Sequence, residues 1–389
     1  MLSNTISVNA LSPKKISTRE LISLCQSGKP DGQTYIYQTT TTGSVEVKLF
    51  PSASWSAEAC KEVTRYLGRS TANRWPEEYI VICNFPCYIV TENGSVINKQ
   101  REIIIESVYE SAGEKTLSRF LGVDLPSGNL DELIGRAGRV DTDKICAAFF
   151  CRWSRVYFHT LSECMVQDTI FQRVGIRPHL HYLGMQRLRG LHQKFLDLLQ
   201  PNIELVGPEV IEVPRAVFST VARRHAALGP DFIQAIEAVK TITLEQAANL
   251  HHIEAPPYLY VSRLGESARP MTNEAEVAAI FAAEGYQVVY PQKLSLIEQA
   301  KMFSNAAVVV GPHGSGLINA AFAPRNGIMF ELRGLYRNGT PDMNDAYRRV
   351  SAIMGLQYGF HIVKNALDSN DWTLPPDSAV RIARSLRDA

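Results

Sequence analysis

The chain has 389 residues, of which 45% are hydrophobic and 20% charged, and its formal net charge is +1. These values are typical of a globular protein, and the length predicts two domains, since domains usually hold about 100–200 residues. The near-neutral charge excludes a general electrostatic attraction to nucleic acid or acidic lipid, so any basic site has to be local. We therefore expect no nucleic-acid partner.

Seven cysteines are present, at positions 25, 60, 83, 87, 146, 151 and 164. Their odd number and their spacing fit no zinc site and no redox pair, which favours reduced thiols and a cytosolic compartment. The N-terminus lacks a signal-peptide pattern, and no apolar run reaches the roughly 20 residues that span a bilayer. A soluble, cytoplasmic protein is expected, and peripheral contact with the inner face of a membrane stays open.

The first 140 residues are predicted to form a β-rich extension. Alternating residues over Thr34–Phe50 predict a hairpin, and Tyr79–Val90 and Glu102–Val108 are β-rich on either side of a turn at Glu92–Gly94. From about residue 141 the pattern changes to alternating strands and helices, which predicts an α/β domain over residues 141–228 with a parallel sheet. The strands are expected at Ile145–Phe150, His179–Leu183, Ile203–Val206 and Val210–Val213, and the helices at Tyr157–Phe171 and Leu188–Leu199.

A second alternating series follows a helix at Pro230–Leu250 and a break at Pro256-Pro257. It predicts an open, doubly wound α/β domain over residues 229–389, in which ligands bind beyond the carboxyl ends of the strands. The strands are expected at Tyr258–Ser262, Gln287–Tyr290, Ala307–Val310 and Ile328–Leu332, and the helices at Asn273–Glu284, Ser295–Ser304 and Gly316–Phe322.

The most informative motif is the segment Gly311–Gly316, which reads GPHGSG between a strand and a helix start. Glycines let a ligand approach the backbone, and the unpaired N–H groups at a helix start suit phosphate. Gly314, Ser315 and Gly316 are therefore predicted to contact a phosphorylated ligand, and His313 is expected to face it. The spacing does not match the dinucleotide-binding fingerprint.

Two arginines follow the first strand of this domain. Ser262-Arg263 ends the strand and Arg269 lies in the next loop, so both guanidinium groups are predicted to reach the crevice of the glycine turn and pair with phosphate oxygens. Glu331, at the end of a neighbouring strand, is a candidate to accept hydrogen bonds from ribose hydroxyls. The alternatives are surface salt bridges for the arginines and an ordinary surface acid for Glu331.

In the first half, His159 and Glu163 are four residues apart and share one face of the predicted helix. An imidazole and a carboxylate together can take a proton from a hydroxyl group, although an ordinary surface pair has the same spacing. Asp141-Thr142-Asp143 matches a metal-binding signature in letters but precedes its strand, so no metal is expected there. The histidines at 179, 181, 192, 251 and 252 lack the partners of a metal site.

The order of motifs in the second half resembles glycosyltransferase family 61, in particular its bacterial polysaccharide enzymes. The motifs are Ser262-Arg263, EGYQVVYP (284–291), SLIEQAKMFSNA (295–306), VVGPHGSGLINAAFAP (309–324) and FEL (330–332). The resemblance extends loosely to Phe158-His159 and Glu163, where the family usually has Tyr-His-Trp and an acid. Thr160 replaces the tryptophan, and Met165–Gln167 stand where a proline-arginine pair is common.

The resemblance implies the GT-B architecture, which is two Rossmann-like α/β domains facing a cleft, here with an N-terminal β-containing extension. Residues 141–228 would form the acceptor side and residues 229–389 the donor-binding side, with the last helix, Asp377–Leu386, crossing back. A sugar would move, with inversion, from a nucleotide sugar, expected to be UDP-linked, to a glycan of a polysaccharide, capsule or lipopolysaccharide, or to a lipid-linked glycan. No metal or other cofactor is expected.

The resemblance also implies roles for individual residues. Glu163 and His159 would provide the catalytic base, and His313 would assist the leaving group. The donor-binding set would be Ser262, Arg263, Arg269, His313, Gly314, Ser315, Gly316, Asn319 and Glu331. The alternatives are another sugar-nucleotide enzyme, such as an epimerase or a pyruvyltransferase-like or sialyltransferase-like enzyme, and a non-catalytic carbohydrate-assembly protein.

Overall fold

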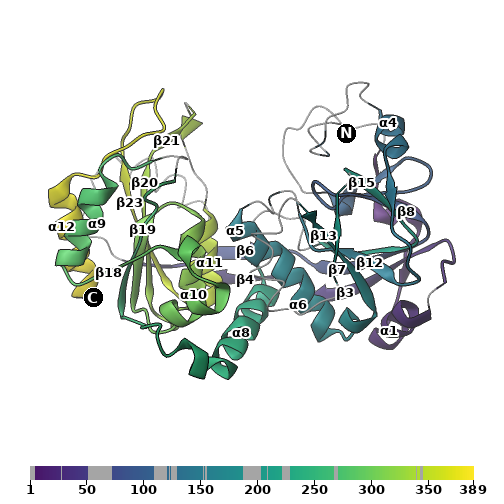
Figure 1. Cartoon of the computed structure of the whole chain (residues 1–389), viewed down its shortest axis with the longest axis horizontal. Coiled ribbons are helices and arrows are strands. Elements are labelled where there is room, and N and C mark those ends of the chain that lie inside the picture. Colours follow the sequence, from purple (N-terminus) through teal and green to yellow (C-terminus); the bar gives the residue numbers. More distant parts are fainter. Residues whose placement is uncertain are drawn as a thin grey trace. The chain divides into compact units, whose positions relative to one another are not determined.

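The structure is a computed structural model of the whole chain (Figure 1). It describes residues 5–27, 29–50, 72–108, 121, 123, 129–151, 153, 156–186, 203–207, 209–220, 228–266, 270–338, 340–341 and 345–389. The chain divides into two compact units: unit 1 is Met1–Gly43 with Trp75–Ala227, and unit 2 is Ser44–Arg74 with Leu228–Ala389. Both units are mixed α/β structures, as predicted.

Unit 1 is built on a seven-stranded sheet that is parallel in its first half. Its order is β14 (Ile203–Val206), β13 (Leu180–Met185), β12 (Ile145–Ala148), β16 (Ala216–Ser219), β7 (Glu78–Asn84), β3 (Gln33–Thr40) and β2 (Lys14–Lys15). Strands β14, β13, β12 and β16 run parallel, whereas β7 is antiparallel to both β16 and β3. The chain goes from β12 to β13 and β14 on one side and places β16 on the other, so the strand order reverses between β12 and β16.

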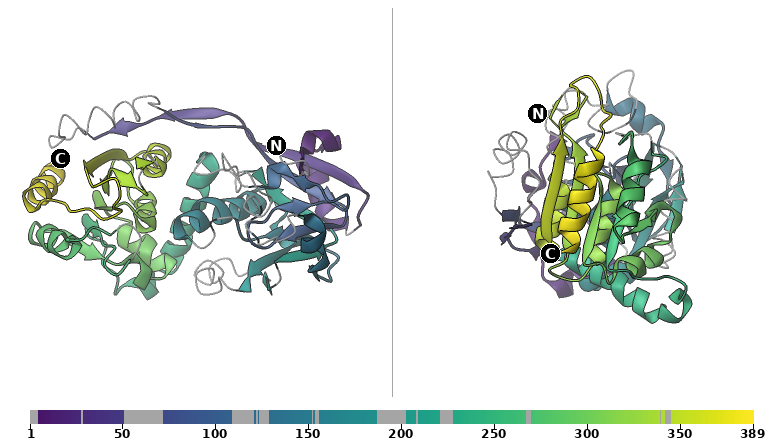
Figure 2. Two further views of the ribbon diagram at one scale, coloured as in Figure 1. Left: turned by 90° about the horizontal axis from the view of Figure 1, so that it is seen from above. Right: turned by 90° about the vertical axis from the view of Figure 1, so that its left-hand side faces the viewer.

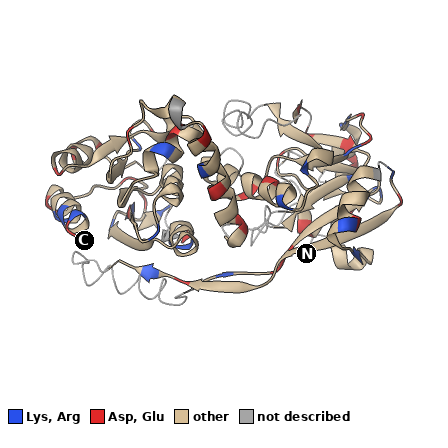
Figure 3. Cartoon of the chain, turned by 90° about the horizontal axis from the view of Figure 1, so that it is seen from below, with Lys and Arg blue, Asp and Glu red and all other residues tan. Residues whose placement is uncertain are grey.

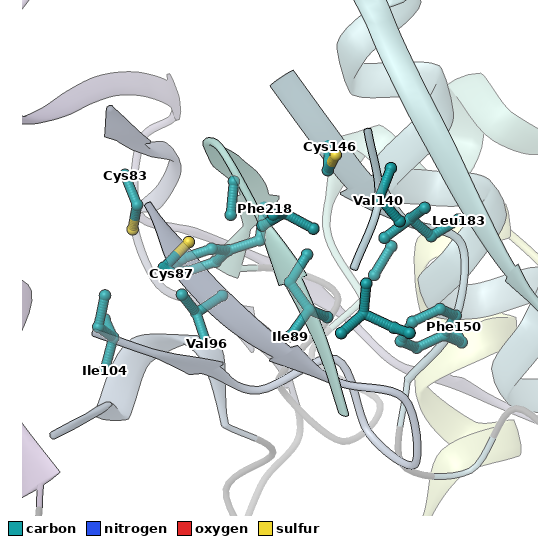
Figure 4. Packing of buried hydrophobic residues seen from close by; sticks show 14 of the residues in the cluster. Cys83, Cys87, Ile89, Val96, Ile104, Val140, Cys146, Phe150, Leu183 and Phe218 are labelled. Carbon is teal, nitrogen blue, oxygen red and sulfur yellow. The ribbon is translucent and has the colours of Figure 1, made fainter. Parts of the chain in front are cut away.

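A second, six-stranded sheet packs on one face of this sheet. Its order is β1 (Thr5–Ile6), β10 (Ile103–Ile104), β9 (Val96–Ile97), β8 (Cys87–Val90), β15 (Val210–Val213) and β11 (Gly138–Arg139). Figure 4 shows the core between the two sheets, where Cys146, Leu183 and Phe218 of the first sheet meet Cys87 and Ile89 of the second. Burial of such apolar side chains contributes about 1.5–3 kcal/mol each for the larger ones. This core holds the two sheets of unit 1 together.

Helix α6 (Met165–Arg173) covers the opposite face of the seven-stranded sheet. Leu183 points into the core between the sheets, so its neighbour Tyr182 points the other way, and the hydroxyl of Tyr182 donates to Asp168 of α6 at 2.7 Å. Burial raises the pKa of Asp168, although Arg177 and Tyr182 lower it. Helix α1 (Thr18–Ser27) is tied to the amino ends of the strands by Arg215, which donates to the carbonyl oxygen of Leu24 at 3.1 Å.

The hairpin predicted over Thr34–Phe50 is wrong. Strand β3 pairs with β7 and β2, and β4 (Gly43–Glu46) pairs with β6 (Ala72–Trp75). Strand β5 (Lys48–Leu49) joins the sheet of unit 2, where Phe50 lies in the core with its ring 6.4 Å from that of Phe330. Phe50 is therefore buried in the core of unit 2 and does not pack across a local turn.

Unit 2 contains a six-stranded, fully parallel sheet. Its order is β18 (Gln287–Val289), β17 (Tyr258–Val261), β19 (Val308–Pro312), β20 (Ile328–Gly334), β23 (Gln357–Val363) and β5. The predicted alternation of strands and helices is confirmed here. The chain passes from β17 to β18 on one side and then to β19 on the other, so the order reverses between β17 and β19.

Helices cover both faces of this parallel sheet, as such sheets require. Helices α9 (Glu274–Ala283) and α12 (Pro376–Arg387) pack together on one face (Figures 1 and 2). The other face carries α8 (Pro230–Glu245), α10 (Leu296–Phe303), α11 (Ala346–Met354) and the 3₁₀ helix η9 (Ser315–Phe322). The C-terminal helix was expected to cross back to the first domain, but its buried residues Ile382 and Leu386 join the core of unit 2.

Charges of both signs are interspersed along both units (Figure 3), which agrees with the small net charge. The cysteines that the structure describes, all except Cys60, are buried and form no disulfide. Among the helices in the described ranges, none is long and apolar enough to cross a membrane. The helix predicted at Leu188–Leu199 lies outside the described residues.

Candidate functional site

The predicted phosphate site lies at the point of strand reversal in unit 2. Strands β17 and β19 are hydrogen-bonded neighbours, with Tyr260 opposite Val310. Arg263 follows the carboxyl end of β17, and the turn His313–Gly316 follows the carboxyl end of β19. In open α/β sheets ligands bind at this reversal, because the two connections leave in opposite directions and open a crevice. The topology therefore brings together the two motifs that the sequence singles out.

The side chain of Arg263 lies close to Gly314. Its Nη1 atom donates to the carbonyl oxygen of His313 at 2.7 Å, and a Cβ atom on Gly314 would lie 2.4 Å from Nε. Gly314 has extended backbone, with φ at 176°, which any residue can adopt. The need for glycine at 314 therefore comes from the close approach of the guanidinium group.

A buried carboxylate fixes the backbone of Arg263. The Oε1 atom of Glu274, in the first turn of α9, accepts hydrogen bonds from the hydroxyl of Ser262 at 2.9 Å and from the backbone N–H of Arg263 at 2.5 Å. Ser262 therefore helps to position Arg263, since its side chain is buried and hydrogen-bonded to Glu274. Sequence reasoning missed Glu274, although an acid at the first position of the next helix is a usable signal.

His313 is held by a second buried carboxylate. Its Nδ1 atom is hydrogen-bonded to Oε1 of Glu331, which also takes a bond from Arg333 at 3.4 Å, while Oε2 accepts from the hydroxyl of Tyr358 at 2.5 Å. Burial alone would raise the pKa of Glu331, but Arg333 and His313 together lower it below its usual value. Glu331 has no exposed surface, so it orients His313 and does not present itself to a ligand.

Tyr347 completes the support of the turn from the first turn of α11. Its hydroxyl donates to the carbonyl oxygen of Gly314 at 2.5 Å, and its ring meets that of His313 edge-on with centroids 5.3 Å apart. The two residues Gly314 and Tyr347 are 33 positions apart in the chain. Nothing in the local sequence pattern indicates this contact, which depends on the packing of α11 against η9.

The remaining predicted donor residues have different surroundings. Ser315 and Gly316 are half-buried at the start of η9, where the first N–H groups of the helix lie. Asn319 is fully buried, and its side-chain amide donates to the carbonyl oxygen of Gly316 at 3.1 Å and to Gln299 at 2.7 Å. Asn319 therefore stabilises the start of η9 from within the core. Arg269 lies outside the described residues.

The predicted His–Glu pair of unit 1 is also brought together. Nδ1 of His159 lies 2.6 Å from Oε1 of Glu163, and the side chains are 10% and 2% exposed, respectively. The pair spans the junction between α5 (Tyr157–His159) and a single π-helical turn, Thr160–Cys164, which continues into α6. Such π-turns are rare and occur frequently at functional sites.

Gln167 anchors this helix at the strand reversal of unit 1. Its Nε2 atom donates to the carbonyl oxygen of Ala148, at the end of β12, at 2.9 Å. Its Oε1 atom accepts from the backbone N–H of Ser219, at the end of β16, at the same distance. The side chain thus bridges the two strands between which the order reverses. Glu163 lies one turn earlier on the helix, beyond the carboxyl edge of the sheet.

Two buried cysteines lie close to Glu163. The Sγ atoms of Cys151 and Cys164 are 3.9 Å apart and buried. Burial raises the pKa of Cys151 well above its usual value, and Cys164 and Glu163 raise it further.

Some groups in the motifs that resemble metal sites have hydrogen-bond partners within the protein. The carbonyl oxygen of Asp143 accepts from Arg215 at 2.8 Å, His181 pairs with Glu204, and His252 pairs with Glu298. Within the described ranges, no group of three or more His, Cys, Asp and Glu side chains is placed to hold a metal ion. His192 lies outside those ranges.

The family model described as Glycosyltransferase 61 matches residues 146–330. This match supports glycosyltransferase family 61. The matched segment begins in β12 and ends in β20, so it includes the His159–Glu163 pair, Arg263 and the whole glycine turn. The family suggests glycosyltransferase activity, with a donor and an acceptor substrate. A search of curated proteins found no matching sequence.

Proposed function

We propose that this protein is an inverting, metal-independent glycosyltransferase of the GT-B type that moves a sugar from a nucleotide sugar to a glycan acceptor. The observation that carries the proposal is the position of the Arg263 guanidinium on Gly314, at the strand reversal of unit 2 and inside the segment that matches family 61. A fixed cation beside unpaired helix N–H groups suits a diphosphate.

The donor diphosphate would lie against Gly314, Ser315 and Gly316, with Arg263 on one side. As the bond between the anomeric carbon and the diphosphate breaks, negative charge grows on the leaving oxygen. Arg263 and His313 would stabilise this charge, and fixed donors of this kind typically contribute about 3–4 kcal/mol to the transition state. The buried Glu331 supports this role because it holds the ring of His313 in place.

The acceptor hydroxyl would lose its proton to the His159–Glu163 pair. The more exposed member is His159, and its Nδ1 atom is already engaged by Glu163, so Nε2 would take the proton. Glu163 would orient the ring and stabilise its positive charge, as the carboxylate does in a hydrolase triad. The acceptor oxygen then attacks the anomeric carbon opposite the leaving diphosphate, which inverts its configuration.

The proposal also names the chemical classes of the donor and the acceptor. A UDP-linked sugar would be the donor, and a polysaccharide, capsule, lipopolysaccharide or lipid-linked glycan the acceptor. The reduced, buried cysteines support a cytoplasmic location, and a lipid-linked acceptor would then be reached from the inner membrane face.

The proposal is tested by a panel of nucleotide sugars. We expect at least one of them to raise the melting temperature of the wild-type protein and to be transferred to a glycan acceptor, with the inverted anomeric configuration in the product NMR spectrum. Incubation with the donor alone should release no epimer, which separates a transferase from an epimerase. Retention of configuration, epimerisation, or no stabilisation by any nucleotide sugar would each contradict the proposal.

A further inference from the structure

An exposed tryptophan lies beside the His–Glu pair of unit 1. Trp153 is 42% exposed, and the other exposed large hydrophobic side chains among the described residues are leucines, at positions 49, 244, 264 and 367. It lies between β12 and α5, and its carbonyl oxygen accepts from the N–H of Val156 at 2.8 Å. An exposed indole ring leaves a large apolar surface in water.

The position of this ring relative to His159 is specific. The two ring centroids are 6.2 Å apart with an angle of 34° between the planes. The ring of Phe158 meets His159 from another side, edge-on at 5.2 Å. His159 is therefore contacted by Phe158, Glu163 and Trp153, and Trp153 is the more exposed of these two aromatic residues, since Phe158 is 5% exposed.

We propose that Trp153 is the stacking platform for the acceptor sugar, which rests on the proposed transferase function and names a binding residue for its acceptor. One face of a pyranose ring carries C–H groups with partial positive charge, and the face of an indole carries negative charge, so the two stack. A sugar stacked on Trp153 would place its hydroxyl groups within reach of His159. Tryptophan suits this task because it provides a wide contact area with little loss of side-chain entropy.

The platform predicts that the acceptor class is a pyranose glycan and that affinity depends on the aromatic ring itself. In the wild-type protein, methyl glycosides of common hexopyranoses and short oligosaccharides of the same sugars would serve as acceptors with the donor that the nucleotide-sugar panel selects. We expect Trp153→Ala to raise the KM for the acceptor by about tenfold or more. The KM for the donor should not change, because only binding of the acceptor is weakened.

Two further variants separate stacking from simple packing against His159. Trp153→Phe keeps a flat ring and should retain most of the acceptor affinity, whereas Trp153→Leu keeps apolar bulk and should lose it as the alanine variant does. Leu244→Ala, at the most exposed of the leucines, is the matched control and should change neither KM. Equal melting temperatures for the four variants would show that the fold is intact.

The outcomes distinguish this inference from the proposed function. If the wild-type protein transfers no sugar, the transferase proposal fails. If it transfers sugar and Trp153→Ala leaves the acceptor KM unchanged, or if Trp153→Leu performs as well as Trp153→Phe, the platform is refuted and the transferase stands. A rise in the donor KM alone would also refute it, because the ring would then act on the donor.

Discussion

The Nη1 atom of Arg263 donates to the carbonyl oxygen of His313 at 2.7 Å, and this bond joins the ends of β17 and β19. The guanidinium group is therefore held in place by the protein alone. Glu274 fixes its backbone, and Gly314 leaves room for its side chain. A cation that is positioned before the ligand arrives needs little reorganisation when a phosphate binds, which is the condition for strong electrostatic stabilisation.

Removal of this cation should weaken donor binding. We expect Arg263→Ala to lower the affinity for a nucleotide sugar at least tenfold, or about 1.4 kcal/mol, in isothermal titration calorimetry. Arg263→Lys should recover only part of this loss, because lysine lacks the planar fork of arginine. Arg384→Ala, at an arginine of α12 that pairs with Glu284, is the control and should bind as the wild type does. Unchanged affinity in Arg263→Ala would exclude a phosphate role.

A methyl group at position 314 should also weaken donor binding, although it removes no charge. The Cβ atom of Gly314→Ala would lie 2.4 Å from Nε of Arg263, so the guanidinium group has to move. We expect a similar loss of donor affinity, and a double variant with Arg263→Ala that is little worse than either single one. Gly135→Ala, where a Cβ meets no atom within 4 Å, is the control. Fully additive losses would show that Gly314 acts independently of Arg263.

The His–Glu pair should govern turnover and not donor binding. Glu163→Gln keeps the shape of the side chain but cannot stabilise a protonated His159. We expect kcat to fall by about 10²–10⁴-fold, the range of general base catalysis, while calorimetry finds unchanged donor affinity. The control is Glu237→Gln, at an exposed acid of α8 that pairs with Lys240. Normal turnover in Glu163→Gln would refute the assignment of the base.

The alternation of unit 2 could be predicted because its strands are buried on both faces. Val308–Val310 and Ile328–Phe330 are continuous apolar runs, each followed by a recognisable change of composition. The place of Arg263 next to the glycine turn followed from the rule that ligands bind at carboxyl strand ends. Tyr347 and Gln167 could not be found this way, since their contacts depend on how helices pack on distant strands.

The pairing of residues 44–50 with strands far away in the sequence also could not be predicted. Strand β5 has two residues, and its partner β23 lies more than 300 positions later in the chain. A local sequence pattern therefore cannot predict this pairing. The alternation around Val45 and Val47 indicates a strand but not the sheet to which it belongs. The π-turn at Thr160–Cys164 could not be predicted either, because its residues fit an α-helical pattern equally well.

The proposed mechanism makes a further prediction about metal ions. Because Arg263, His313 and helix N–H groups would carry the charge of the leaving diphosphate, transfer should not require a divalent cation. We expect equal rates after dialysis against EDTA and after addition of Mg²⁺ or Mn²⁺. A complete loss with EDTA that the metal restores would contradict this, and Asp141 and Asp143 would then be the first candidates to test.

The Glu331–His313–Arg333 cluster predicts a pH dependence of stability. Folding lowers the pKa of Glu331 from its ordinary value of 4.5, because Arg333 and His313 outweigh the effect of burial. The charged cluster therefore stabilises the folded state fully above pH 4.5, and this contribution is lost as the pH falls through the lowered pKa. Glu331→Gln should reduce the free energy of unfolding by about 3–5 kcal/mol at pH 7, since it removes the negative charge that faces the buried guanidinium group of Arg333.

Urea unfolding of both proteins at pH 7 and at several values below 4.5 would measure this difference. We expect the gap between wild type and Glu331→Gln to narrow as the pH falls, because protonation of Glu331 makes the two side chains alike in charge. Glu204→Gln is the matched control, since Glu204 pairs with His181 at 2.8 Å but is 47% exposed, and water screens such pairs. A gap that stays constant down to low pH would mean that packing around residue 331, and not its charge, stabilises the turn.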